Sequence, residues 1–141
     1  MLSARAALRG GTGLVTLAVA STLHPAIVSA VPESTYLLLP HSLGVLNEHA
    51  APVLEKELED YDAMLVGPGL GSTPETESFL RALFDLGVKR RNTGFIQSTE
   101  QEKPRTSKLP PLVIDADGLN LLSRIPDWHH RLPENSVLPP H

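Results

Sequence analysis

Two aspartates follow an apolar segment late in the chain. Asp115 and Asp117 come directly after Leu-Pro-Pro-Leu-Val-Ile at residues 109–114. In α/β proteins polar side chains reach a ligand from this position, at the carboxyl end of a strand. Paired carboxylates can hold a magnesium ion or orient a hydroxyl group. The structural alternative is that one caps a helix beginning near Leu119 while the other accepts backbone N–H groups. Both interpretations stay open for Asp115, whereas we expect Asp117 to cap.

A glycine-rich stretch is the second candidate. Three glycines stand within five residues: Gly67, Gly69 and Gly71. They follow the apolar run at residues 63–66, lack Cβ atoms that would cover the backbone, and can adopt positive φ. Thr73, Pro74 and Glu75 then indicate a helix start. The spacing matches neither G-x-G-x-x-G nor a P-loop. The pattern therefore predicts a turn that presents backbone N–H groups to a ligand, with a purely structural tight turn as the alternative.

Two other polar residues are candidates for ligand binding. Asn120 can bind a ligand or the adjacent turn, and His141 follows the last apolar segment, where an imidazole can hydrogen-bond a ligand or stay exposed. The other histidines show no metal-ligand spacing. The chain has no cysteine, which excludes disulfides, thiolate nucleophiles and zinc–thiolate sites.

Alternating strands and helices position these residues. Apolar runs predict strands at residues 12–20, 35–39, 63–66 and 109–114, with a last strand beginning at 137–138. Helical spacing and caps predict helices at residues 1–10, 24–30, 52–61, 74–86 and 119–123, and residues 41–49 are expected to form a loop. The alternation indicates the α/β class with a largely parallel sheet. No helix is expected after the last strand, and its exposed edge would be available to pair with another strand. The formation of a homo-oligomer is therefore one open alternative.

Composition limits the class of protein. A chain of 141 residues suits one domain, and 41% hydrophobic residues exclude compositional disorder. The formal net charge of −4 gives no general attraction for nucleic acid, and no apolar run is long enough to span a bilayer. Residues 89–108 hold six of the twelve lysines and arginines. They predict a long solvated loop, with phosphate binding as the alternative.

The first thirty residues also resemble a targeting segment. Arg5 and Arg9, the apolar run at 14–20, and Val-Ser-Ala at 28–30 imitate a secretory signal with its cleavage site, and the arginines also suit a transit peptide. A His-Pro pair at residues 24–25 interrupts the region that should stay apolar in a signal. We therefore expect a cytoplasmic protein.

Three stretches in order resemble one family. SARAALRGGTGLVTLAV, VGPGLGSTPET and VIDADGLNLL, followed by VLPPH, are similar to ADP/ATP-dependent NAD(P)H-hydrate dehydratase. The resemblance implies a three-layer α/β/α sandwich of the ribokinase-like superfamily. It also implies phosphorylation of the ring hydroxyl of hydrated NADH or NADPH by ADP or ATP with Mg²⁺. Phosphate then leaves and the cofactor is restored. By motif match, Gly67–Gly71 and His141 would contact the hydrated nucleotide, and Asp115 and Asn120 would line the site between the two substrates.

The chain also departs from this family. The family's Gly-Thr-Gly-Asp motif, which supplies an anion hole and the catalytic aspartate, does not occur here, and Pro139 replaces a threonine in the VLPPH segment. Residues 1–141 are therefore expected to form a partial domain, incomplete at both ends, with no catalytic residue of its own and negligible activity alone. The alternatives are a sugar or vitamin kinase of the same superfamily and a non-catalytic α/β fragment.

Overall fold

The computed structural model describes residues 1–86 and 109–140. The expected solvated loop at residues 89–108 and the candidate His141 lie outside the described residues. The described helices are α1 (Leu2–Arg9), α2 (His24–Val28), α3 (Ala51–Glu57), α4 (Pro74–Leu83) and α5 (Asp117–Leu122). The described strands are β1 (Thr16–Ala20), β2 (Thr35–Leu39), β3 (His41–Ser42), β4 (Val45–Leu46), β5 (Met64–Val66) and β6 (Leu112–Ile114). Short 3-10 turns occupy Ser21–Leu23, Glu48–Ala50, Leu58–Asp60 and Trp128–Arg131.

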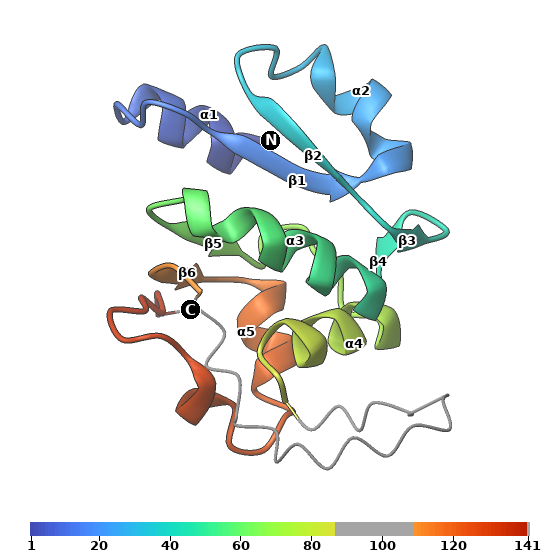
Figure 1. Ribbon diagram of the computed structural model, residues 1–141, viewed down its shortest axis with the longest axis vertical. Coiled ribbons are helices and arrows are strands. Elements are labelled where there is room, and N and C mark those ends of the chain that lie inside the picture. The colour runs from blue at the N-terminus through green and yellow to red at the C-terminus, as the bar shows by residue number, and fades with distance from the viewer. Residues whose placement is uncertain (87–108, 141) are drawn as a thin grey trace.

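The N-terminal third forms a parallel pair of strands flanked by two helices (Figure 1). β1 and β2 run in register from Thr16 opposite Thr35 to Ala20 opposite Leu39. The Tyr36 hydroxyl of β2 donates a 2.7 Å hydrogen bond to the Val31 carbonyl, just after α2. The strand predicted at residues 12–20 is therefore present as β1, although it begins only at Thr16.

Residues 41–49 are not a plain loop, so that prediction is wrong. β3 and β4 form a short antiparallel hairpin. Its two turn residues, Leu43 and Gly44, have φ of 50° and 85°, as a two-residue hairpin turn requires. The His41 imidazole Nδ1 accepts a 3.1 Å hydrogen bond from the Gly44 N–H. Leu-Gly lacks the Asn-Gly or Asp-Gly signal of such turns, which is why the sequence pattern concealed it.

A second parallel pair carries the core. β5 and β6 pair from Met64 opposite Leu112 to Val66 opposite Ile114. Val137 joins β6 through an isolated parallel bridge to Val113, so the expected last strand is reduced to one bridged residue. Side chains of α3, α4 and α5 join those of β5 and β6 in one hydrophobic cluster, and α3 also contacts β2 (Figure 1). The fully buried side chains of this core include Phe79, Leu80, Leu83, Leu112, Ile114, Leu121 and Leu122.

The α/β class and the predominance of parallel strands are confirmed. The described strands fall into three two-stranded sheets, of which one is antiparallel. A 2.8 Å hydrogen bond from the Tyr61 hydroxyl to Thr16 Oγ1 links the segment before β5 to β1. Within the described ranges, every helix falls short of the length and apolar character that crossing a bilayer requires.

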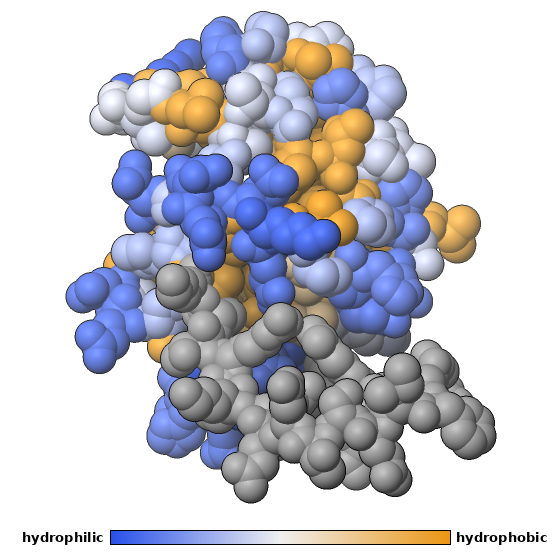
Figure 2. All heavy atoms as spheres, viewed as in Figure 1, coloured by the Kyte–Doolittle hydropathy of each residue, from blue (hydrophilic) through white to orange (hydrophobic). Residues whose placement is uncertain are grey.

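Hydrophobic and charged residues are distributed unevenly on the surface. Figure 2 shows hydrophilic residues over α3 and a hydrophobic band along β2, with another hydrophobic spot at the β3–β4 hairpin. In α3, Ala51 and Leu54 are buried whereas the charged residues Lys56 and Glu57 are exposed, which accounts for the hydrophilic surface over this helix.

Candidate functional site

The glycine turn lies at the carboxyl end of β5, as the sequence predicts. Gly67, Gly69 and Gly71 have φ of 123°, 75° and 82°. The Leu70 N–H donates a 2.9 Å hydrogen bond to the Gly67 carbonyl and closes a tight turn. Gly67 is buried, whereas Pro68 and Gly69 are exposed. The turn thus presents its tip to solvent and its first residue to the protein interior.

Gly67 contacts the start of α5 more closely than any other residue type could. A Cβ placed on Gly67 would lie 1.9 Å from the Asp115 carbonyl oxygen and 2.9 Å from the Gly118 nitrogen. A Cβ placed on Gly118 would lie 3.0 Å from Gly67 Cα. The two glycines therefore form a backbone-to-backbone contact that brings the turn after β5 against the turn after β6. Sequence analysis named Gly67 but gave Gly118 no role, because its partner is 51 residues away in the chain.

Asp117 bridges the two turns instead of capping α5. Its Oδ2 accepts a 2.9 Å hydrogen bond from the Gly71 N–H. The N-cap of α5 is Ala116, without a side-chain capping bond, and the helix begins at Asp117 and not near Leu119. The prediction that Asp117 caps the helix is therefore wrong. Its carboxylate serves the alternative role, accepting a backbone N–H, and the donor belongs to the glycine turn.

Asp115 and Ala116 form a strained turn at the carboxyl end of β6. The Asp115 N–H donates to the Val66 carbonyl at 3.1 Å, and the Gly118 N–H donates to the Asp115 carbonyl at 3.0 Å. Ala116 has φ 49° and ψ −124°, a conformation that favours glycine. Such strain costs on the order of 1–3 kcal/mol and tends to occur at functional sites. Asp115 Oδ1 accepts a 2.8 Å hydrogen bond from the Ala116 N–H, so its carboxylate helps to hold this backbone.

The structure places the remaining predicted residue, Asn120, on the exposed surface of α5 one turn after Asp117. Gly67, Gly69 and Gly71 thus follow β5, and Asp115 follows β6, at the carboxyl ends of two paired strands, whereas Asn120 lies further along α5.

Thr76 is a polar residue of this region that sequence analysis missed. It is fully buried, and its Oγ1 accepts a 2.9 Å hydrogen bond from the Thr73 N–H while lying 2.9 Å from the Gly71 carbonyl oxygen. Thr73 in turn accepts from the Thr76 N–H at 3.3 Å, which completes a capping box. The expected cap at Thr73 is therefore confirmed. The Thr-x-x-Thr spacing was the available signal, although the usual partner at the third position is Glu or Gln.

Glu75 provides a titration test of the start of α4. A hydrogen bond from its own backbone N–H and one from the Thr73 hydroxyl lower the pKa of the Glu75 carboxyl. A lowered folded-state pKa means that the ionised group favours folding above the unfolded pKa. That contribution disappears as the pH falls through the folded pKa. We expect the Glu75 carboxyl to titrate below the ordinary glutamate range in an NMR titration, and Thr73→Ala to raise its pKa. Titration at or above the ordinary range would contradict this arrangement.

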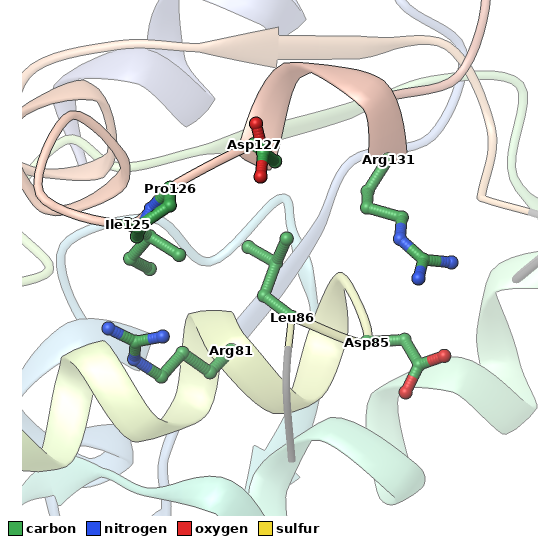
Figure 3. Close-up of a pocket in the computed structure, with 7 residues that line it drawn as sticks. All are labelled: Arg81, Asp85, Leu86, Ile125, Pro126, Asp127 and Arg131. Atoms are coloured by element: carbon green, nitrogen blue, oxygen red, sulfur yellow. The ribbon is translucent and has the colours of Figure 1, made fainter.

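A hollow in the surface lies away from this site. Its volume is about 270 Å³, and its lining includes Arg81, Asp85, Ile125 and Arg131. Figure 3 shows these side chains around the C-terminal end of α4, with the Asp127 and Arg131 segment opposite. The glycine turn precedes the N-terminal end of the same helix. A helix of ten residues is about 15 Å long, so the hollow does not belong to the glycine-turn site.

Metal ligands are not gathered in the described part of the chain. Residues 1–86 and 109–140 contain no group of three or more histidine or acidic side chains arranged to hold a metal ion. Asp115 and Asp117 both accept backbone hydrogen bonds. We therefore assign no metal ligand among the described residues.

Comparison with known proteins places the chain in a family. The family model described as NAD(P)H-hydrate dehydratase matches residues 1–141. The chain belongs to the NAD(P)H-hydrate dehydratase family. This confirms the resemblance carried by the glycine turn and the Asp-Ala-Asp-Gly segment.

Relatives in this family are considerably longer than the chain. An ADP-dependent (S)-NAD(P)H-hydrate dehydratase of Staphylococcus aureus is 38% identical over 125 residues, 89% of this chain and 35% of that protein. A bifunctional NAD(P)H-hydrate repair enzyme of Salinibacter ruber is 34% identical over 125 residues, 87% of this chain and 19% of that protein. The chain thus spans between a fifth and about a third of these relatives.

A solved structure supports the fold. A ribokinase-like superfamily protein from Enterococcus faecalis superposes with a TM-score of 0.63 at 22% identity, over 99% of this chain and 39% of that one. The ribokinase-like fold is confirmed, and the family names do not favour the sugar or vitamin kinase alternative.

Proposed function

We propose that this chain contributes the hydrated-nucleotide side of an ADP-dependent NAD(P)H-hydrate dehydratase. The observation that carries the proposal is the pairing of the glycine turn with the Asp115–Asp117 turn at neighbouring strand ends, held by the 2.9 Å bond between Gly71 and Asp117. Membership of the family supports the substrate class, and the relatives' names support ADP as the phosphoryl donor. We also propose that Mg²⁺ accompanies the phosphoryl donor and that ATP is the alternative donor.

The chemistry would proceed in two steps. The hydroxyl oxygen of the hydrated nicotinamide ring would attack the terminal phosphoryl group of ADP. A new O–P bond would form, the bridging O–P bond of ADP would break and AMP would leave. The hydroxyl proton would pass to the catalytic aspartate of the family's Gly-Thr-Gly-Asp motif, which this sequence does not contain. The resulting phosphate is a better leaving group than hydroxide. Its departure, with loss of a proton from the neighbouring ring carbon, restores the double bond. Such phosphoryl transfer depends mainly on positioning and charge stabilisation.

The residues of this chain would position the substrate. The exposed tip of the turn, with Gly69 at its centre, brings backbone groups to the nucleotide without interposed side chains. Asp115 and Asn120 would hydrogen-bond the substrate beside it, and His141 would contact the same ligand. Asp117 keeps the turn in place through Gly71 and thus acts as a positioning residue. Because the chain lacks a Gly-Thr-Gly-Asp motif, we propose negligible turnover by the chain alone.

We propose a cytoplasmic location, because the proposed substrate is a damaged form of a cellular cofactor.

A binding experiment with Gly69→Ala tests the proposal. No atom lies within 4 Å of a Cβ placed at Gly69, so the variant should fold, at a cost of about 1–2 kcal/mol for its positive φ. The new methyl group would separate the backbone from the nucleotide. We expect the dissociation constant for hydrated NADH, measured by calorimetry, to rise about tenfold or more.

Gly11→Ala is the matched control. Gly11 has φ of 94°, has no atom within 4 Å of its Cβ position and follows α1, outside the glycine turn. It should lose similar stability and keep full affinity. Equal affinity in both variants, or no binding by the unaltered chain, would contradict the proposal. Recovery of NADH absorbance at the rate of a complete enzyme would contradict the expected lack of turnover.

A further inference from the structure

Side chains of two helices hold the last glycine of the turn. The Gly71 N–H donates a 2.9 Å hydrogen bond to Asp117 Oδ2 of α5. The Gly71 carbonyl oxygen lies 2.9 Å from the hydroxyl of Thr76 in α4, which can donate its hydrogen to it. α4 and α5 contact each other (Figure 1). Each of the two backbone polar groups of Gly71 is thus held by a side chain, one from each helix.

Steric contact does not fix Gly71. Among the described residues, no atom lies within 4 Å of a Cβ position at Gly71, whose φ is 82°. A glycine in open space rotates about its backbone bonds more freely than any other residue. Gly67 differs, because it lies against the Asp115 carbonyl. Packing therefore fixes the start of the turn, whereas the end of the turn depends on the hydrogen bonds to Thr76 and Asp117.

The side chain of Thr76 does more than cap α4. The third position of a capping box is usually Glu or Gln, which accepts the N–H of the capping residue. The Thr76 hydroxyl makes this bond with the Thr73 N–H at 2.9 Å. A carboxylate would have no hydrogen to donate to the Gly71 carbonyl, whereas a hydroxyl has one, which can also go to the Thr73 carbonyl oxygen at 2.9 Å. Threonine therefore fits a contact with the glycine turn that capping alone does not require.

Gly71 is close to the part of the turn that faces solvent. Gly69, the exposed residue at the tip, stands two residues before Gly71. In the described part of the chain, no atom lies within 4 Å of a Cβ position at Gly69 either. The position of the tip therefore follows from the two ends of the turn. A loop that is already ordered binds a ligand more tightly, because binding does not have to restrict its motion.

We propose that Thr76 is a positioning residue of the nucleotide site, whose hydroxyl holds the Gly71 carbonyl and thereby fixes the tip of the glycine turn for the hydrated nicotinamide nucleotide. This inference rests on the function proposed above, because it requires that the turn contact that ligand. Thr76 is completely buried, so it does not itself touch the ligand. It acts through Gly71, and its removal lowers affinity because the ligand must then order the turn.

The affinity of Thr76→Val for hydrated NADH tests the inference. Calorimetry is run at a temperature at which circular dichroism shows every variant to be folded. We expect Kd to rise about tenfold in Thr76→Val and to stay within about twofold in Thr76→Ser, which restores the hydroxyl. A merely structural role would lower stability and leave the affinity of the folded protein unchanged.

Amide hydrogen exchange supplies a measurement without ligand. The Leu70 N–H donates a 2.9 Å hydrogen bond to the Gly67 carbonyl inside the turn. We expect this amide to exchange about tenfold faster in Thr76→Val than in Thr76→Ser, because the turn would open locally more often. Equal exchange rates in the two variants would overturn the inference.

Tyr61→Phe is the matched control. It also removes one hydroxyl, which donates a 2.8 Å hydrogen bond to Thr16 Oγ1. Tyr61 precedes β5, whereas the glycine turn follows it, so affinity and Leu70 exchange should stay unchanged. Undiminished binding by Thr76→Val, or an equal loss in Tyr61→Phe, would overturn the inference and leave the proposed function standing. No binding by the unaltered chain would instead contradict the proposed function, and with it the role of Thr76.

Discussion

Gly67→Ala is expected to destabilise the protein by about 3–5 kcal/mol, the sum of a strained backbone and a steric clash. The φ of Gly67 is 123°, a region that residues with a Cβ rarely adopt. The added Cβ would lie 1.9 Å from the Asp115 carbonyl oxygen. It would also lie 2.9 Å from the Gly118 nitrogen. Both of these neighbours are backbone atoms, which cannot rotate away as the end of a side chain can. Relief therefore requires separation of the two turns and loss of their mutual contact.

Urea unfolding followed by circular dichroism measures this effect. Gly69→Ala is the appropriate control, because Gly69 has φ of 75° but no atom within 4 Å of its Cβ position. The control should lose only the backbone term, about 1–2 kcal/mol. If the two variants unfold at the same urea concentration, the close contact between the glycine turn and the start of α5 is absent in solution.

Thr76→Val is expected to destabilise the protein by about 2–4 kcal/mol, because part-buried backbone groups of Gly71 and Thr73 lose their hydrogen-bond partner. The Thr76 hydroxyl accepts a hydrogen bond from the Thr73 N–H. It also lies 2.9 Å from both the Gly71 and the Thr73 carbonyl oxygens, to which it can donate its hydrogen. Valine keeps the shape of threonine and removes only these bonds. Water cannot replace them easily, since the side chain is completely buried.

Thr76→Ser separates hydrogen bonding from packing. Serine keeps the hydroxyl and loses one methyl group, which should cost about 1 kcal/mol. Thr73→Ala should cost about 1 kcal/mol, the usual effect of removing a cap. A smaller loss for Thr76→Val than for Thr76→Ser in thermal unfolding would show that packing, and not the hydroxyl, holds the glycine turn to α4.

The local sequence determined most of the elements and the position of the turn. Thr73 caps α4 and Pro74 begins it, because each residue suits one position by its own chemistry. The strand at Thr35–Leu39 was predicted at its exact bounds from a run of β-formers and apolar residues ended by Pro40. The tight turn after β5 also follows from the sequence, since Gly67, Gly69 and Gly71 can adopt positive φ and leave the backbone uncovered by side chains.

Only the tertiary structure decided which groups meet. Asp117 follows Ala116 in a segment that suits a helix cap, yet its carboxylate accepts the N–H of Gly71, 46 residues earlier. Position 118 requires glycine because Gly67 Cα would lie 3.0 Å from any Cβ there, and no local sequence pattern reveals that contact. Leu65, Val113 and Val137 likewise come side by side only through strand pairing. Local rules act over a few residues, whereas these contacts are set by parallel strands whose partners are distant in the chain.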